Sequence, residues 1–393
     1  MSTPKLATAF SLPSGFRINE VHAGPRLSGI VPAAPSLGPL ADFNGNWHGN
    51  GFNTIFRPDN SKTPTPLPIP AGGDNILELN LTNETLSFSP SLGSVPNRGT
   101  DPQGDIFLNG VPYLQSITDV TNAAQPTGIH FEPGLWMSVP ATSTPAEGVS
   151  VVRMASIPHG TTITAQGTSS KISGAPNIPS VDITPFITGS NPKSLVHFAS
   201  QTAATPGTPR IPQDLTSFIS AGTITQAMLD DPNSVLRNHI SHQKIVSTTI
   251  INISTNPDSP LFGGGADNIA FLQGNPTNSP DLPTPHPNAQ TLLMDATFWI
   301  ETVEHTILVP VFKPGQAPLQ LHEEANVVGK ATATFTVRPP VDIKVPRPIT
   351  FTSKQIQYSQ VVFLNFNGLT WPHVSVATLV PAGAVPIPPS AWQ

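Results

Sequence analysis

The sequence predicts an all-β fold, and three of its features point to that class. Proline supplies 47 of the 393 residues and is spread along the whole chain, which excludes long helices and favours short strands joined by irregular connections. Hydrophobic residues make up 37% of the chain, enough for a core. Most apolar stretches alternate with polar residues, as half-buried strands do. A chain of this length forms one large domain or two of ordinary size.

Charge and cysteine content narrow the classes of partner and compartment. Charged residues are only 11% of the chain, and the net charge of -6 comes without a basic cluster, so we expect no nucleic-acid partner. No apolar run approaches a membrane span, and the N-terminal residues lack the long apolar region of a secretory signal. The absence of cysteine excludes disulfides and thiolate chemistry. We expect a cytoplasmic protein without a membrane span; export by another route and the oligomeric state stay open.

In chain order, an extended proline-rich N-terminal arm is expected over residues 1–40, where periodicity is weak. A β-barrel domain with insertions follows over residues 41–315. After a first strand over 46–56, further strands are predicted to begin near Ile76, Asp105, Gly128, Ser150, Lys193, Lys244, Asp267 and Leu292. Residues 316–393 predict additional strands, which we expect to pack on the barrel as a C-terminal extension.

One segment has helical rather than strand periodicity. Residues from about 211 to 242 carry short apolar stripes at helical spacing, and Gly222 and Pro232 divide them into short helices. Such an insertion between barrel strands serves either as a lid or as a cover for a sheet edge. The sequence leaves both alternatives open.

The first expected strand has glycine at alternating positions. Gly45, Gly49 and Gly51 flank Trp47, and residues two apart lie on one face of a strand. Glycine weakens a strand unless something approaches its backbone closely or the strand bends sharply. A barrel corner beside an internal cavity would meet both conditions. Trp47, Gly49, Gly51 and the neighbouring His48 are therefore candidate ligand contacts.

Three stretches together resemble the nitrobindin-like family of calycin-like β-barrels. They are the G-x-W-x-G-x-G pattern from Gly45, the H-x-E-x-G-x-W pattern of residues 130–136 and the stretch MDATFWIE of residues 294–301. They occur in the family's order but at longer spacings. The resemblance implies an elaborated barrel with large insertions, and residues from about 325 onward have no counterpart in it.

The same resemblance bears on haem. Nitrobindins hold the haem iron through a histidine three residues before the alanine of the closing strand. Counting back from Ala296 gives Leu293, and leucine cannot coordinate iron. We therefore expect no cofactor by that route. His286 is near in sequence and could substitute, so a haem-binding protein stays an alternative.

Candidate catalytic residues fall on two expected strands. His130, Glu132 and Trp136 share one face of the first, and Arg153 and His159 share a face of the next. If the strands pair, Glu132 and Arg153 face the same space, where they would either anchor an acidic ligand group or form an ion pair that fixes the register. The imidazoles of His130 and His159 suit general acid–base chemistry, or hydrogen bonding at strand ends.

Two further groups involve carboxylate and histidine. Trp299, Glu301 and His305 share a face, so we expect Trp299 and Glu301 to contact the ligand, and the apolar neighbours of Glu301 to bury it and raise its pKa. His239 and His242 have the spacing of metal ligands on a helix. Without an acidic partner or a third histidine close in sequence, we expect a solvated helix end and no metal site.

Two main function classes follow from these residues. The first is a protein that binds a small, largely apolar molecule inside a barrel cavity, with Trp47 and Trp136 among its walls. The second is a cofactor-independent enzyme, such as an isomerase, cyclase or hydratase, that uses His130, Glu132 and Arg153 in the same cavity. A proline-rich structural or assembly protein is a third alternative. For the tryptophans, a packed barrel without a cavity is the competing interpretation.

Overall fold

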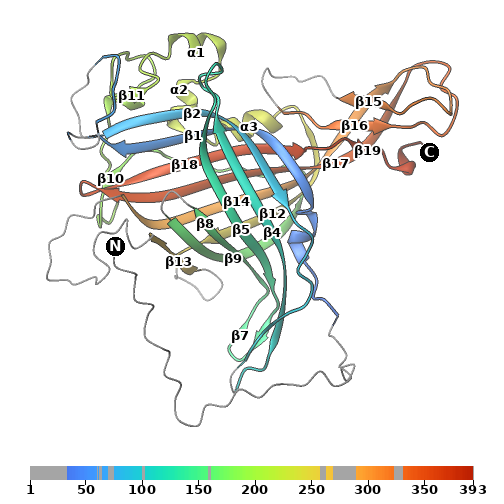
Figure 1. Ribbon diagram of the computed structural model, residues 1–393, viewed down its shortest axis with the longest axis horizontal. Helices are drawn as coiled ribbons and strands as arrows, with labels where there is room; N and C mark the ends of the chain where they lie inside the picture. The colour runs from blue at the N-terminus through green and yellow to red at the C-terminus, as the bar shows by residue number, and fades with distance from the viewer. Residues whose placement is uncertain are drawn as a thin grey trace, which may run out of the picture. The chain divides into compact units, whose positions relative to one another are not determined.

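The computed structural model describes residues 33–59, 61, 64–69, 75–99, 102–157, 161–256, 263–268, 289–322 and 331–392. Ten strands of this part form a closed antiparallel β-barrel, which confirms the all-β fold class (Figure 1). The barrel strands are β1 (Gly45–Pro58), β2 (Asn75–Phe88), β4 (Ile106–Asp119), β5 (Thr127–Val139), β8 (Ser150–Ile157), β9 (Thr161–Ser173), β12 (Lys244–Ser254), β14 (Gln290–Val309), β17 (Arg347–Phe366) and β18 (Leu369–Pro381).

The order of the strands around the ring differs from their order in the chain. It runs β2, β1, β18, β17, β14, β12, β9, β8, β5, β4, and the pairing of β2 with β4 closes it. A closed ring leaves no long unpaired strand edge, which protects such a sheet from edge-to-edge association. The shorter elements around it are β3 (Val95–Asn97), β6 (Thr142–Ser143), β7 (Ala146–Glu147), β10 (Phe186–Ile187), β11 (Arg210–Ile211), β13 (Gly263–Asn268), η2 (Ala199–Gln201) and η3 (Pro389–Trp392).

The C-terminal part of the chain belongs to the barrel, and this corrects the expected boundary at residue 315. β17 pairs with β14 and β18 pairs with β1, so the ring cannot close without these two strands. The separate C-terminal unit is smaller. It consists of the three-stranded sheet of β15 (Leu319–His322), β16 (Thr334–Val337) and β19 (Val385–Pro386).

The far ends of β14 and β17 connect the barrel to this small sheet. Each strand is 20 residues long, and their pairing continues to Val309 opposite Arg347. Past the barrel, their apolar side chains pack against β16 in a separate core that includes Ile307, Phe335 and Phe351. The extension therefore has a hydrophobic core of its own next to the barrel wall.

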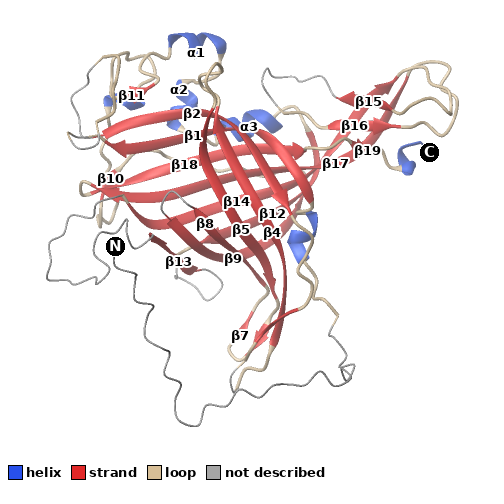
Figure 2. Ribbon diagram, viewed as in Figure 1, coloured by secondary structure: helices blue, strands red, loops and turns tan. Residues whose placement is uncertain are grey.

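The helical insertion falls where the sequence predicts it. It contains α1 (Thr216–Ala221), α2 (Gln226–Asp230) and α3 (Ser234–Ile240) (Figure 2). Leu229 and Leu236 of these helices pack against Phe52 of β1 and Val376 of β18, on the outer face of the barrel. The insertion therefore covers an outer face of the sheet, whereas the alternatives expected from the sequence were a lid and a cover for a sheet edge.

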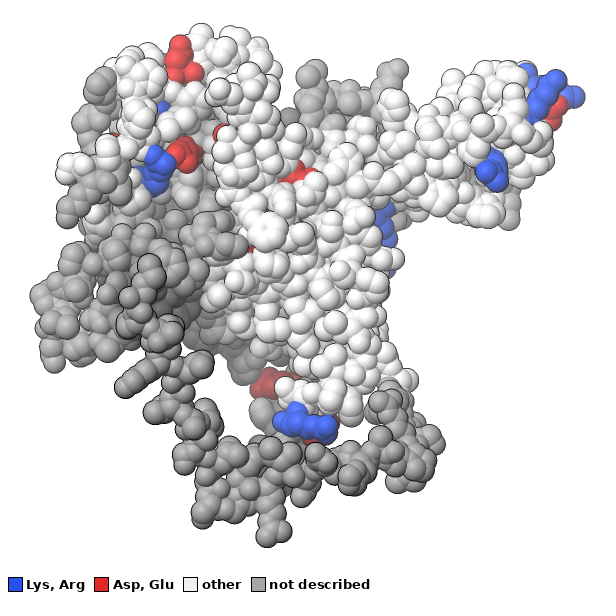
Figure 3. Space-filling view, in the orientation of Figure 1, with Lys and Arg blue, Asp and Glu red and all other residues white. Residues whose placement is uncertain are grey.

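The interior of the barrel is apolar toward one end. The short 3-10 helix η1 (Gly38–Asp42) inserts Leu40, and Phe43, which directly follows the helix, lies beside Phe88 and Trp136. Charged side chains are few on the face that Figure 3 shows, and several blue and red groups lie next to each other. Among the described residues, no helix has the length and apolar character needed to cross a membrane.

Candidate functional site

The alternating glycines of β1 have a structural explanation. A Cβ atom on Gly49 would lie 1.9 Å from the carbonyl oxygen of Thr378, and one on Gly51 would lie 2.2 Å from that of Val376. Both contacts are far shorter than any real Cβ contact, so β18 occupies the space that a side chain would need. The close approach is thus that of a neighbouring strand, which removes the reason to treat Gly49 and Gly51 as ligand contacts.

Trp47 and Trp136 do point into the barrel, as predicted, where both belong to the interior core and Trp136 lies in a layer of packed rings. Phe43 stacks on Phe88 with ring centroids 4.8 Å apart. The Trp136 ring meets Phe298 edge-on at 5.1 Å. Both tryptophans are at most 4% exposed. These rings fill this end of the barrel, as in the competing interpretation of a packed interior.

Glu132 and Arg153 meet inside the barrel, where the predicted pairing of their strands brings them together. β5 pairs with β8, and Arg153 Nη2 donates to Glu132 Oε1 at 2.5 Å. The other two guanidinium nitrogens are also used. Nε donates to the Tyr113 hydroxyl at 2.9 Å, and Nη1 donates to Gln360 Oε1 at 2.6 Å. Every nitrogen of Arg153 therefore has an acceptor within the protein.

Glu132 is equally surrounded by donors. The Tyr113 hydroxyl donates to Oε1, and His130 Nε2 lies 3.0 Å from Oε2. Burial acts to raise the pKa of Glu132, but the Arg153 charge and the hydrogen bonds from His130 and Tyr113 outweigh it and hold this pKa at about 2. The carboxylate is therefore ionised at neutral pH. The guanidinium group of Arg153, the partner of Glu132, lies 5.4 Å from the ring centroid of Phe298.

Gly134 makes this arrangement possible. It lies opposite Tyr113 across the β4–β5 pair, and a Cβ atom on it would lie 2.4 Å from the Tyr113 ring. Because the glycine leaves this space open, the tyrosine ring lies across the strand and its hydroxyl reaches Glu132. The glycine in the H-x-E-x-G-x-W pattern thus leaves room for the ring of a tyrosine on the neighbouring strand.

A second buried carboxylate, Glu84 of β2, was not predicted. Its oxygens accept hydrogen bonds from the Tyr358 hydroxyl at 2.6 Å, from Thr82 at 3.1 Å and from Gln115 at 3.3 Å. No cation forms an ion pair with it among the described residues, and burial outweighs these hydrogen bonds, so its pKa rises to about 7. The barrel interior therefore holds two carboxyl groups whose pKa values differ by several units.

Three predicted ligand contacts lie outside the barrel. Phe298 and Ile300 of β14 belong to the interior core, so the alternate residues Trp299 and Glu301 face outward, where Trp299 packs beneath the helical insertion. His48 also faces outward and is exposed. The three expected motif strands therefore do not converge on one interior. The physical reason is that β14 is buried on both faces, which hides its inward register in the sequence.

The haem position does not fit an iron ligand. Met294 and Ala296 point into the barrel core, so Leu293 faces outward opposite Phe363 of β17. A residue at this place in the strand would not reach the interior. His286 and the candidate catalytic residue His159 lie outside the described residues.

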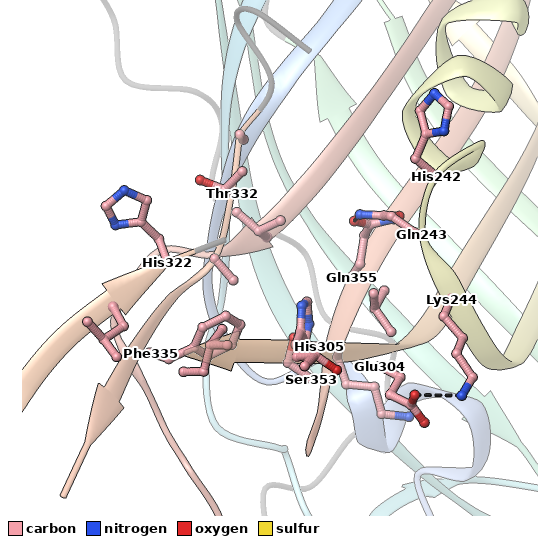
Figure 4. A pocket seen from close by; sticks show the side chains of 18 of the residues that line it. His242, Gln243, Lys244, Glu304, His305, His322, Thr332, Phe335, Ser353 and Gln355 are labelled. Carbon is pink, nitrogen blue, oxygen red and sulfur yellow. Dashed lines mark hydrogen bonds and ion pairs between the residues drawn. The ribbon is translucent and has the colours of Figure 1, made fainter. Parts of the chain in front are cut away.

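A pocket of about 640 Å³ lies against the outer barrel wall, between the end of α3 and the small C-terminal sheet (Figure 4). Its floor is made by the far ends of β14 and β17. On one side, His242, Gln243 and Lys244 follow α3; on the other, Phe335 belongs to β16 (Figure 4). The pocket is thus built from parts of the chain that lie far apart in the sequence.

Polar side chains occupy the floor and one wall of this pocket. His305 Nε2 lies 2.8 Å from Ser353 Oγ, across the β14–β17 pair. Gln243 and Gln355 join their amide groups by two hydrogen bonds of 3.1 and 3.0 Å. The apolar wall consists of the core of the extension, whose members at the pocket are Ile307, Leu321, Ala331, Ala333, Phe335 and Val380.

The predicted burial of Glu301 is confirmed, and the group lies just behind this pocket. Gln355 Nε2 donates to Glu301 Oε2 at 2.6 Å, while Glu301 Oε1 is buried without a hydrogen-bond partner. Burial raises the pKa of Glu301 to about 8, although the hydrogen bond from Gln355 opposes the shift. Glu301 is therefore mostly protonated at neutral pH.

His239 and His242 both line the pocket. His239 is buried, which corrects the expectation of a solvated helix end for this residue, whereas His242 is exposed. His305 and His322 join them from β14 and β15, far away in sequence. In the described part of the chain, no group of three or more His, Asp or Glu side chains could hold a metal ion. The chain matches no family model, no curated protein and no solved structure.

Proposed function

We propose that this chain is a small-molecule-binding β-barrel protein, and that the pocket between the barrel wall, α3 and the C-terminal sheet is its binding site. The observation that carries the proposal is the pocket itself. Its volume of about 640 Å³ falls within the range of roughly 300–1,000 Å³ typical of small-molecule sites. An apolar wall faced by a few placed polar groups is the usual composition of such sites.

The barrel interior supports this choice by contrast. A ligand among the rings around Trp136 would have to displace packed side chains. Arg153 and Glu132 are hydrogen-bonded to each other. Arg153 also donates to Tyr113 and Gln360, and Glu132 also contacts His130. We assign this ion pair the register-fixing role that the sequence left open, because its groups are already satisfied within the protein. We therefore place the ligand site on the outer wall of the barrel, and not in the interior where the sequence predicted it.

A tryptophan introduced into the pocket tests this proposal. Thr332 lines the pocket, whereas Thr336, also half-buried and four residues further along, does not. Thr332→Trp is expected to fill the pocket and Thr336→Trp to leave it unchanged. The measurement is native mass spectrometry of the purified proteins, followed by titration with an apolar fluorescent probe.

In the expected outcome, retained molecules or one-to-one probe binding are lost in Thr332→Trp and kept in Thr336→Trp. If the wild-type protein and the two variants take up the same molecules with equal affinity, the ligand binds elsewhere and the assignment of this pocket is wrong. Far-ultraviolet circular dichroism of both variants checks that the barrel stays folded.

A further inference from the structure

The polar side of the pocket has a definite chemical character, because most of its groups donate hydrogen bonds. It presents imidazoles, two amides, the Ser353 hydroxyl and the ammonium groups of Lys244 and Lys354. Glu304 is the only acidic side chain among the described residues that line it, and its Oε1 lies 2.6 Å from Lys244 Nζ. With two lysines and one glutamate, the formal charge of this lining is +1 with neutral histidines.

Asp42, which is not among the lining residues, is ion-paired with Lys354, so each of the two ammonium groups has a carboxylate partner. The site is therefore neutral in a chain whose formal net charge is -6. A recess without net negative charge, whose polar side chains are mainly hydrogen-bond donors, favours an anionic group over a cationic one. Lys354 is held in place at the recess, since its Nζ donates to Asp42 Oδ2 at 2.9 Å and to Thr302 Oγ1 at 3.2 Å.

The opposite side of the pocket is apolar and packed against the core of the extension. Leu321 and Phe335 belong to the core of the C-terminal extension, and the Phe335 ring packs against Phe351 and His305 with centroids 4.7 and 4.8 Å apart. His305 therefore lies at the boundary between the two sides. Figure 4 shows this arrangement, with the amide pair and Lys244 on one side of His305 and Phe335 on the other.

From these two sides we infer that the pocket binds an amphipathic organic anion. Its acidic group would face His242, Lys244 and Ser353, where charge-assisted hydrogen bonds are available. Its aliphatic or aromatic body would lie against Leu321 and Phe335, where removal from water stabilises it. This inference rests on the proposed binding function and names the class of ligand for the same site.

Three probes of equal chain length and different head group test the inference on the full chain: decanoate, decan-1-ol and decyltrimethylammonium. Isothermal titration below the micelle concentration is expected to show decanoate binding at one to one. The alcohol and the cation should bind at least about tenfold more weakly, since they lack the charge that the donors stabilise.

Pocket variants identify the two ends of the ligand. His242→Ala, combined with the charge-neutral pair Lys244→Gln and Glu304→Gln, is expected to weaken decanoate by about tenfold and leave decan-1-ol unchanged. Leu321→Asn should weaken the binding of both decanoate and decan-1-ol. His197→Ala is the matched control, because His197 is also an exposed histidine but lies outside the pocket lining.

The outcomes separate this inference from the proposed function. Decan-1-ol or the cation binding as tightly as decanoate, with loss in Thr332→Trp, would overturn the anion assignment and leave the pocket as a binding site. Decanoate binding that ignores the His242 and Lys244 changes would also overturn it. If no probe binds and Thr332→Trp changes no retained molecule, the proposed function itself fails.

Discussion

Replacement of Glu301 by glutamine is expected to stabilise the protein at neutral pH. In the folded protein the pKa of this carboxyl group is raised to about 8 from a reference value of 4.5, chiefly by burial. Between these two values the group is protonated when folded and ionised when unfolded. Unfolding then releases a proton, so the contribution of Glu301 to stability falls as pH rises through this window and is constant above it.

The magnitude follows from the pKa values. At pH 7 the unfolded group lies 2.5 units above its reference pKa of 4.5, and each unit corresponds to about 1.4 kcal/mol, so keeping it neutral costs about 3 kcal/mol. Glutamine removes this cost and keeps an oxygen that accepts from Gln355. The amide NH2 group of the glutamine would lie at the position of Glu301 Oε1, which has no hydrogen-bond partner. This unsatisfied donor costs about 1 kcal/mol. The net gain is about 2 kcal/mol at pH 7.

Urea denaturation of the wild-type protein and Glu301→Gln between pH 4 and pH 9 measures this difference. We expect no gain near pH 4, where the Glu301 carboxyl group of the wild-type protein is largely protonated in both the folded and the unfolded state, and a gain that grows until about pH 8. Glu304→Gln is the matched control on the same strand, because Glu304 is partly exposed and ion-paired with Lys244. Its effect should stay below about 1 kcal/mol.

The opposite result would refute the reasoning. If Glu301→Gln destabilises the protein at pH 7 and the loss grows with pH, the native carboxylate is ionised and interacts favourably with a cationic group. The amide pair of Gln243 and Gln355 would then be organised around a charge, and the account of this wall of the pocket would be wrong.

The remaining predictions concern the barrel. Glu132→Gln should cost about 3–5 kcal/mol, because it leaves the Arg153 charge buried without its partner; calorimetry showing a change within experimental error would contradict the ion-pair assignment. Gly51→Ala should lower the melting temperature sharply, since its Cβ would overlap a β18 carbonyl, whereas Gly128→Ala, with nothing within 4 Å, should be mild. Trp136→Ala should cost about 3–5 kcal/mol as a packed core residue; a cost near zero would point to a cavity beside it.

The sequence predicts the class of fold well because its signals are local. Proline spread and alternation specify strands wherever one face is buried and the other is not, as in β5, whose exposed Phe131 alternates with buried Glu132. The order of the strands around the ring cannot be predicted from local signals. β17 follows β14 across a long connection and β18 returns to β1, and these pairings depend on contacts that no local pattern encodes.

Face assignment fails where alternation disappears. In β14 the consecutive residues Phe298, Trp299 and Ile300 are all buried, because the strand packs inward on the barrel core and outward beneath the insertion. A strand buried on both faces reads as a continuous apolar run. Trp299 and Phe298 are then equally good candidates for the interior, and only the pairing with β12 and β17 decides between them.

The pocket illustrates why sequence patterns can indicate single residues of a site without indicating the site itself. His239 and His242 stand out by spacing, but the residues that give them meaning, His305 and Ser353, come from strands that pair far away in the sequence. Glu84 is the contrasting case. It alternates with Thr82 and Leu86 on one face of β2, so a carboxylate stands in an otherwise inward-facing set. That signal, a charge on the buried register of a strand, is the same one that identifies Glu132. It is readable without the structure, and it identifies a buried ionisable group before its partners are known.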